Sequence, residues 1–169
     1  MYEVIRSGHF SVPGVGVSQK QIEAELKSIT VTLARPEEKT GKMPFGMEGL
    51  VPPLWHTALV EALNRMAIFQ DDGPKKVSLS VKVLKLEVDA GFSMVAHTAA
   101  RYELIDRKTG DLIYTQDIKS SGATPTEYSL SGSNHVPEAI NRAVQNNITQ
   151  FLQALETINF AKPMFPVKR

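Results

Sequence analysis

The sequence has no cysteine and almost no net charge. Its 169 residues carry 19 basic and 18 acidic side chains. Without cysteine these residues provide no disulfide, no thiolate metal ligand and no cysteine nucleophile. Balanced charge provides no overall field that would attract a polyanion. We therefore expect no nucleic-acid partner.

Long apolar runs are also missing. No stretch approaches the roughly 20 apolar residues that a helix needs to cross a bilayer, so we expect no transmembrane segment. Residues 1–6 lack the basic and apolar regions of a signal peptide, and the start resembles a mature or trimmed end. A cysteine-free chain suits the cytoplasm. It equally suits a periplasmic lipoprotein domain whose lipidated cysteine precedes these residues.

Recognisable catalytic and cofactor motifs are absent as well. The sequence contains no Gly-x-Ser-x-Gly, no His-Glu-x-x-His and no phosphate-binding Gly-x-x-x-x-Gly-Lys-Ser/Thr. Two pairs of adjacent carboxylates lie in predicted turns, where solvated pairs are common. We therefore assign no catalytic residue, no metal site and no cofactor, and expect a protein that is not an enzyme. The residues considered are His9, His56, His97, His135, Glu37, Glu38, Asp71 and Asp72.

Glycine and proline interrupt the beginning of the chain. They predict an irregular arm over residues 1–18. Ser18 fits the N-cap of a short helix over residues 19–26. Residues 27–35 alternate between apolar and polar side chains, which predicts a half-buried strand.

A long loop over residues 36–53 is the next expected feature, because it holds four prolines and three glycines. It also contains Met43, Phe45 and Met47. In one interpretation these apolar side chains fold onto the edge of the core. In the other they form a methionine-bearing surface that meets a partner.

Helical periodicity is clear in two places. Pro52 and Pro53 suit the first turn of a helix whose apolar stripe continues to Ile68. After a polar stretch over residues 120–134, Ser133 or Asn134 suits the N-cap of a second helix. Its apolar stripe runs from Val136 to Ile158, and we expect a flexible tail over residues 162–169.

Three extended segments lie between these helices. The first alternates from Val77 to Val88, with a phase slip at Val83-Leu84 that predicts a β-bulge. The second covers residues 93–106. The third covers residues 112–119, after a turn in which Gly110 suits the left-handed conformation. Tyr102 and Tyr114 lie on facing strands, where we expect a cross-strand pair that would belong to a binding surface if its face is exposed.

The order strand, helix, three-strand meander, helix predicts an α+β fold in a single domain, residues 1–169. We expect a two-layer sandwich in which both helices pack on one face of an antiparallel sheet. Three segments carry a resemblance to the soluble domains of small bacterial envelope lipoproteins, the YajG-like group. They are residues 77–84, residues 100–106 with the Gly110 hairpin, and residues 143–152.

This resemblance implies a non-catalytic binding or assembly accessory at the periplasmic face of the bacterial envelope. Its partner would be an envelope protein or a glycolipid, held by the 36–53 loop and an exposed sheet face through Met43, Phe45, Met47, Tyr102 and Tyr114. One alternative is a cytoplasmic enzyme or small-ligand-binding protein, which a deep pocket joining His97 to carboxylates would favour. A homo-oligomeric structural protein is a further alternative.

Overall fold

The computed structural model describes residues 10–43, 46–90, 93–125 and 135–160. The expectations for residues 1–9, Phe45, residues 126–134 and the tail therefore lie outside the described residues. In chain order the elements are β1 (Ala24–Leu33), α2 (Val51–Met66), β2 (Lys75–Ala90), β3 (Ser93–Asp106), β4 (Leu112–Pro125) and α3 (His135–Leu155).

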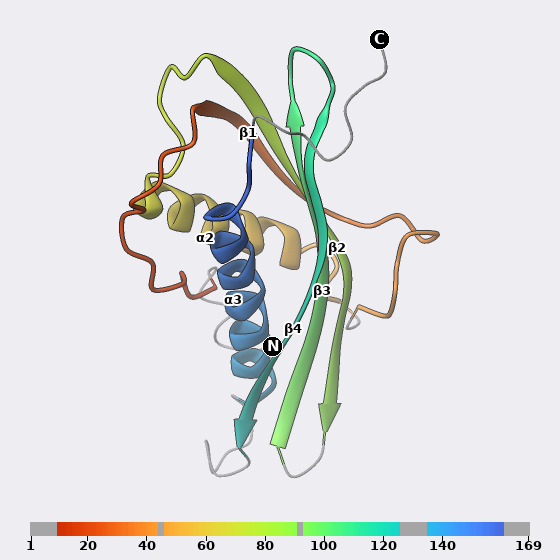
Figure 1. Ribbon diagram of the computed structural model, residues 1–169. Helices are drawn as coiled ribbons and strands as arrows, with labels where there is room; N and C mark the ends of the chain where they lie inside the picture. The colour runs from red at the N-terminus through yellow and green to blue at the C-terminus, as the bar shows by residue number, and fades with distance from the viewer. Residues whose placement is uncertain (1–9, 44–45, 91–92, 126–134, 161–169) are drawn as a thin grey trace.

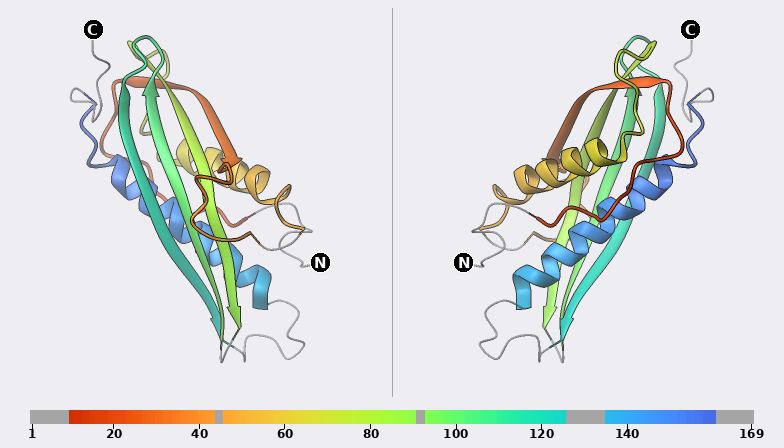
Figure 2. Two further views of the ribbon diagram at one scale, coloured as in Figure 1. Left: turned by 90° about the vertical axis from the view of Figure 1, so that its right-hand side faces the viewer. Right: turned by 90° about the vertical axis from the view of Figure 1, so that its left-hand side faces the viewer.

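The four strands form one sheet in the order β1-β2-β3-β4, and both helices pack on one of its faces (Figures 1 and 2). The expected two-layer α+β sandwich is confirmed. β2, β3 and β4 form the expected antiparallel meander, whereas β1 runs parallel to β2 and makes the sheet mixed. The connection explains the difference, because a helical crossover such as α2 returns the chain to the end where β1 began.

The short helix expected over residues 19–26 does not form. Ala24 already belongs to β1, and Ile22 forms a parallel bridge with Phe69. The alternation of Ile22, Ala24 and Leu26 with two glutamates has the period of a strand. Pairing with neighbouring segments therefore prevails over the local capping signal of Ser18.

The phase slip in β2 is a bulge, as the sequence predicts. The register shifts between Val83 and Lys85, and Leu84 packs against Ala34 and Ala99 on the far side of the sheet. Because of this extra residue, Leu86 returns to the side of the helices on which Val83 lies. The bulge thus keeps Leu86 and Val88 on the same side as Val83, in or against the main core.

β4 extends to Pro125, beyond the expected end at Lys119. The added residues lack large apolar side chains, so their pattern gives little strand signal. Gly122 is required there, because a Cβ atom at this position would lie 2.3 Å from the backbone nitrogen of Ala143 on α3. The β3–β4 turn contains Gly110 with φ of 78°, the left-handed conformation that the sequence predicts.

The helices begin close to the expected residues. α2 has prolines in its first turn and ends where Ala67 adopts φ of 51° and donates its N–H to the carbonyl of Leu63. The core between helices and sheet includes Trp55, Tyr102 and Phe151, all of which are fully buried. Among the described residues, no helix is long and apolar enough to cross a membrane.

Candidate functional site

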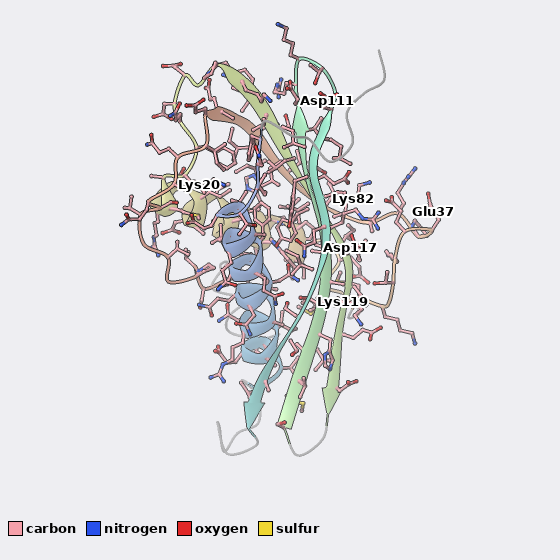
Figure 3. The ribbon with its side chains drawn as sticks, in the orientation of Figure 1. Lys20, Glu37, Lys82, Asp111, Asp117 and Lys119 are labelled. Carbon is pink, nitrogen blue, oxygen red and sulfur yellow. The ribbon has the colours of Figure 1, made fainter. Side chains whose placement is uncertain are left out.

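The sheet face opposite the helices carries most of the charged side chains of the meander. We call it the open face, because among the described residues only the segment 34–43 lies against it. Figure 1 shows this segment on the side of the sheet away from both helices, and Figure 3 labels Glu37 at its outer bend. Alternation along the strands places the following residues on the open face: Lys82, Lys85, Glu87, Asp89, His97, Ala99, Arg101, Glu103, Thr115, Asp117, Lys119 and Ser121.

Glu38 connects the segment 34–43 to the open face. Its carboxylate accepts hydrogen bonds from Arg35 Nε at 2.7 Å and Lys82 Nζ at 3.0 Å. Arg101 lies 3.6 Å from the same carboxylate. The hydrogen bonds from Arg35 and then Lys82 lower the pKa of Glu38 to about 2. Glu38 therefore remains charged under neutral and mildly acidic conditions.

Arg101 and Asp117 form a two-pronged pair across β3 and β4. Arg101 Nε and a terminal guanidinium nitrogen donate to the two carboxylate oxygens at 2.7 and 3.0 Å. The hydrogen bonding with Asp117 raises the pKa of Arg101. Together with Glu38 and Lys82, this pair orders charged side chains across three strands. The open face thus presents a fixed pattern of both charges.

Residues 40–42 continue the sheet beyond the end of β1. Thr40 N–H donates to the carbonyl of Leu84 at 3.2 Å, and Leu86 N–H donates to the carbonyl of Lys42 at 2.8 Å. Lys42 N–H also donates to the Glu87 carboxylate at 2.9 Å. This part of the expected 36–53 loop is therefore bound to the edge of β2 and forms one border of the open face.

His97 lies on the open face opposite Glu87 on β2, 3.3 Å from the Asp89 carboxylate. It borders a surface hollow of about 260 Å³, lined by Lys85, His97, Thr98, Lys119, Ser120 and Ser121. This is not the deep pocket with carboxylates that would favour the enzyme alternative. Among the described residues, no group of three or more histidines and carboxylates is placed to hold a metal ion.

The structure places most of the sequence-predicted binding residues in or beside the core. Tyr102 is fully buried and Tyr114 is 8% exposed, both on the side of the helices, so the exposure on which their role depended is not met. Tyr102 faces Gln116 and Tyr114 faces Leu104, so the two tyrosines are diagonal neighbours and not the expected direct pair. Both rings contact Phe151, and Tyr102 stacks on it at a centroid distance of 4.2 Å.

The two described methionines of the loop agree in part with the interpretation that its apolar side chains fold onto the edge of the core. Met47 is buried in the core. Met43 is half-buried, packs against the core and lines a surface cavity with Leu86 and Val88. Of the predicted binding residues that the structure describes, Met43 is thus the one with exposed surface beside the open face. Phe45 lies outside the described residues.

The residues that order the open face were missed by sequence reasoning. Glu38 belongs to a carboxylate pair that we interpreted as solvated. Its neighbour Glu37 is indeed exposed, but Glu38 turns onto the sheet. Arg101 and Asp117 are sixteen positions apart, and only the β3–β4 register brings them opposite each other. Opposite charges at polar positions of two strands joined by a hairpin are the signal that would have suggested this pair.

Comparisons with known proteins give structural neighbours only. No family model matches the chain, and no curated protein matches it. A Xanthomonas campestris protein of the DUF330 family is similar over 87% of this chain and 94% of its own, with 14% identity and a TM-score of 0.55. A candidate lipoprotein from Caulobacter crescentus has 14% identity over 76% of this chain and 88% of its own, with a TM-score of 0.50.

A third neighbour is the hypothetical protein CT253 from Chlamydia trachomatis. It has 10% identity over 82% of this chain and 97% of its own, with a TM-score of 0.50. At such identities the likeness concerns the fold alone. The resemblance to small bacterial lipoprotein domains is confirmed at that level.

Proposed function

We propose that this protein is a non-catalytic binding or assembly domain at the periplasmic face of the bacterial envelope, and that the open face receives a protein partner. The observation that carries the proposal is the fixed charge pattern formed by Glu38, Lys82, Arg101 and Asp117. These side chains are already ordered by ion pairs, so they would lose little side-chain entropy when a partner with complementary charges binds.

The dimensions of the open face suit a protein. Strands of 14 to 16 residues rise about 3.3 Å per residue and lie about 4.8 Å apart. Three such strands cover roughly 700 Å² before the segment 34–43 is added, against about 800 Å² per partner in a standard interface. Charges of both signs at fixed positions would also favour a partner with the complementary pattern over one with like charges.

The core supports a scaffold role for the opposite side of the sheet. Every buried polar side-chain atom among the described residues has a hydrogen-bond partner. The fold shared with a candidate lipoprotein supports the envelope as the compartment. In this proposal a lipid anchor would be attached to a cysteine upstream of residue 1.

Site-specific photo-crosslinking in bacterial cells tests the proposal. A photoreactive amino acid would replace Thr115 on the open face or Asn64 on the exposed side of α2. We expect one protein adduct of defined mass from position 115 and none from position 64. The purified partner should then bind the unmodified protein in a two-component assay.

The charge pattern is tested with Arg101→Gln and, as its control, Arg65→Gln on α2. Arg65 pairs with Glu61 on the same helix, so its loss leaves the open face unchanged. We expect Arg101→Gln to weaken partner binding about tenfold, because several fixed charges lose their common neighbour. Equal adducts from positions 115 and 64, or equal binding by the two variants, would refute the assignment of the open face.

A further inference from the structure

Two lysines flank the small side chain of Ala99 on the open face. The register places Lys85 on β2 and Lys119 on β4 directly opposite Ala99 on β3. Ala99 itself is buried against Ala34 and Leu84, and a surface hollow lies beside it. Both lysines line this hollow together with His97 and Ser121. Figure 3 labels Lys119 among the open-face residues.

Two local features position Lys85 at this hollow. The bulge at Leu84 turns Lys85 to the open face, where regular alternation after Val83 would have directed it to the helices. Gly41 then covers the stem of Lys85, because a Cβ atom at Gly41 would lie 2.8 Å from Lys85 Cδ and 3.0 Å from its Cβ. The segment 34–43 therefore restrains this side chain from one side.

The neighbouring carboxylates are occupied by other groups. Glu87 accepts the N–H of Lys42, Asp89 faces His97, and Asp117 is held by both prongs of Arg101. Neither Lys85 nor Lys119 forms an ion pair within the part of the chain that the structure describes. The hollow is thus bordered by two positive charges whose nearby acids have other partners.

We propose that this hollow binds a phosphate-type anion, held between the ammonium groups of Lys85 and Lys119 with the Ser121 hydroxyl as a further donor. A tetrahedral dianion accepts hydrogen bonds on several sides, and lysine binds phosphate as a mobile point charge. The anion would come from a phosphomonoester headgroup of an envelope lipid or from free phosphate. This site does not depend on the protein partner proposed above.

Binding of the anion is measured by titrating the isotope-labelled protein with inorganic phosphate at constant ionic strength, with amide NMR shifts as the readout. Saturable shifts should centre on Ala99 and Ser121. Lys85→Met and Lys119→Met should each weaken binding about two- to fivefold, the range for single exposed charge contacts, and the double variant should abolish saturation. Lys108→Met, a lysine in the exposed β3–β4 turn, serves as the matched control and should bind as the unmodified protein does.

A second arm identifies the source of the anion. Vesicles of phosphatidylcholine with and without phosphatidic acid are sedimented with the protein and with the double variant. Retention only with phosphatidic acid, lost in the double variant, supports a lipid headgroup. Phosphate binding without retention supports a free anion.

The inference is overturned if phosphate gives no saturable shift and phosphatidic acid no retention, or if the double variant binds as well as the unmodified protein. Normal binding of the protein partner by that variant would leave the proposed function intact. Conversely, Arg101→Gln could lose partner binding while it binds phosphate normally. That result would show that the anion site does not depend on the partner-binding function.

Discussion

The hydroxyl of Tyr102 donates a hydrogen bond of 2.9 Å to the Asn147 side chain in the middle of the core. The same hydroxyl accepts the indole N–H of Trp55 at 3.3 Å. Asn147 in turn donates to Thr98 Oγ1 and to the carbonyl of Ile118. One buried network therefore joins α2, β3, β4 and α3. Such a network fixes how the helices are placed over the sheet, because a shifted helix would leave buried polar groups unpaired.

Replacing Tyr102 by phenylalanine should lower the free energy of unfolding by about 1–3 kcal/mol. The substitution removes the donor to Asn147 Oδ1 and the acceptor of Trp55 Nε1, and an unsatisfied buried polar group costs about this much. Urea unfolding followed by circular dichroism measures the change. Tyr114→Phe is the control, since the Tyr114 hydroxyl bonds to Gln116, an exposed residue. Equal losses in the two variants would contradict a special role of the buried network.

Gly122→Ala should destabilise the protein strongly. The new Cβ would lie 2.3 Å from the Ala143 nitrogen and 2.7 Å from the Ala139 carbonyl oxygen, so α3 would have to move away from β4. We expect a loss of at least about 1–3 kcal/mol, the usual cost of overpacking, because the obstructing atoms are backbone. Thermal unfolding measures the effect. Gly49→Ala is the control, because nothing lies within 4 Å of the added Cβ there, and a similar loss in both variants would refute the packing argument.

Lys20 contributes to stability from outside the core by capping the C-terminal end of α3. Its ammonium donates to the carbonyls of Leu155, Glu156 and Ile158 at 3.3, 3.2 and 2.6 Å. A cation at this end of a helix also interacts favourably with the helix dipole, and partly buried cases reach about 2 kcal/mol. We expect Lys20→Met to lower the free energy of unfolding by about 1–2 kcal/mol. Hydrogen exchange of the α3 amides should accelerate most near Leu155, and unchanged exchange there would contradict the capping role. Lys39→Met removes an exposed lysine and should have little effect.

The meander and the two helices could be predicted because each has a strong local period. The bulge at Leu84 could also be predicted, because the apolar positions of β2 change there from odd-numbered to even-numbered residues. The direction of β1 could not be predicted in the same way, because the alternation of Ile29, Val31 and Leu33 is identical for parallel and antiparallel pairing.

The exposed face of β3 was ambiguous for a physical reason. α3 approaches the sheet closely, so the covered side of β3 holds the small residues Ala96 and Ala100, while Ile105 lies on the other side. Apolar side chains therefore occur on both sides, and the open side differs mainly in carrying His97, Arg101 and Glu103. The charge pattern of the open face depends on register and on the path of residues 34–43. Neither is encoded in the local pattern.

The pKa of Glu38 makes one contribution to stability depend on pH. Arg35 and Lys82 lower this pKa from its usual 4.5 to about 2 in the folded protein. Between these values the unfolded chain binds more protons at this carboxyl than the folded protein does, so the free energy of unfolding rises with pH across that window. The stabilisation is complete above about pH 5 and is lost as the pH falls toward 2.

Glu38→Gln should remove this part of the pH dependence. Glutamine keeps the shape of the side chain but accepts no proton and forms weaker hydrogen bonds with Arg35 and Lys82. Urea unfolding between pH 2 and pH 6 should show the variant less stable than the unmodified protein at pH 6 and nearly equal at pH 2. The exposed Glu23, replaced by glutamine, is the control and should give a curve parallel to that of the unmodified protein. A constant difference between Glu38→Gln and the unmodified protein at every pH would show that Glu38 acts through packing and not through its charge.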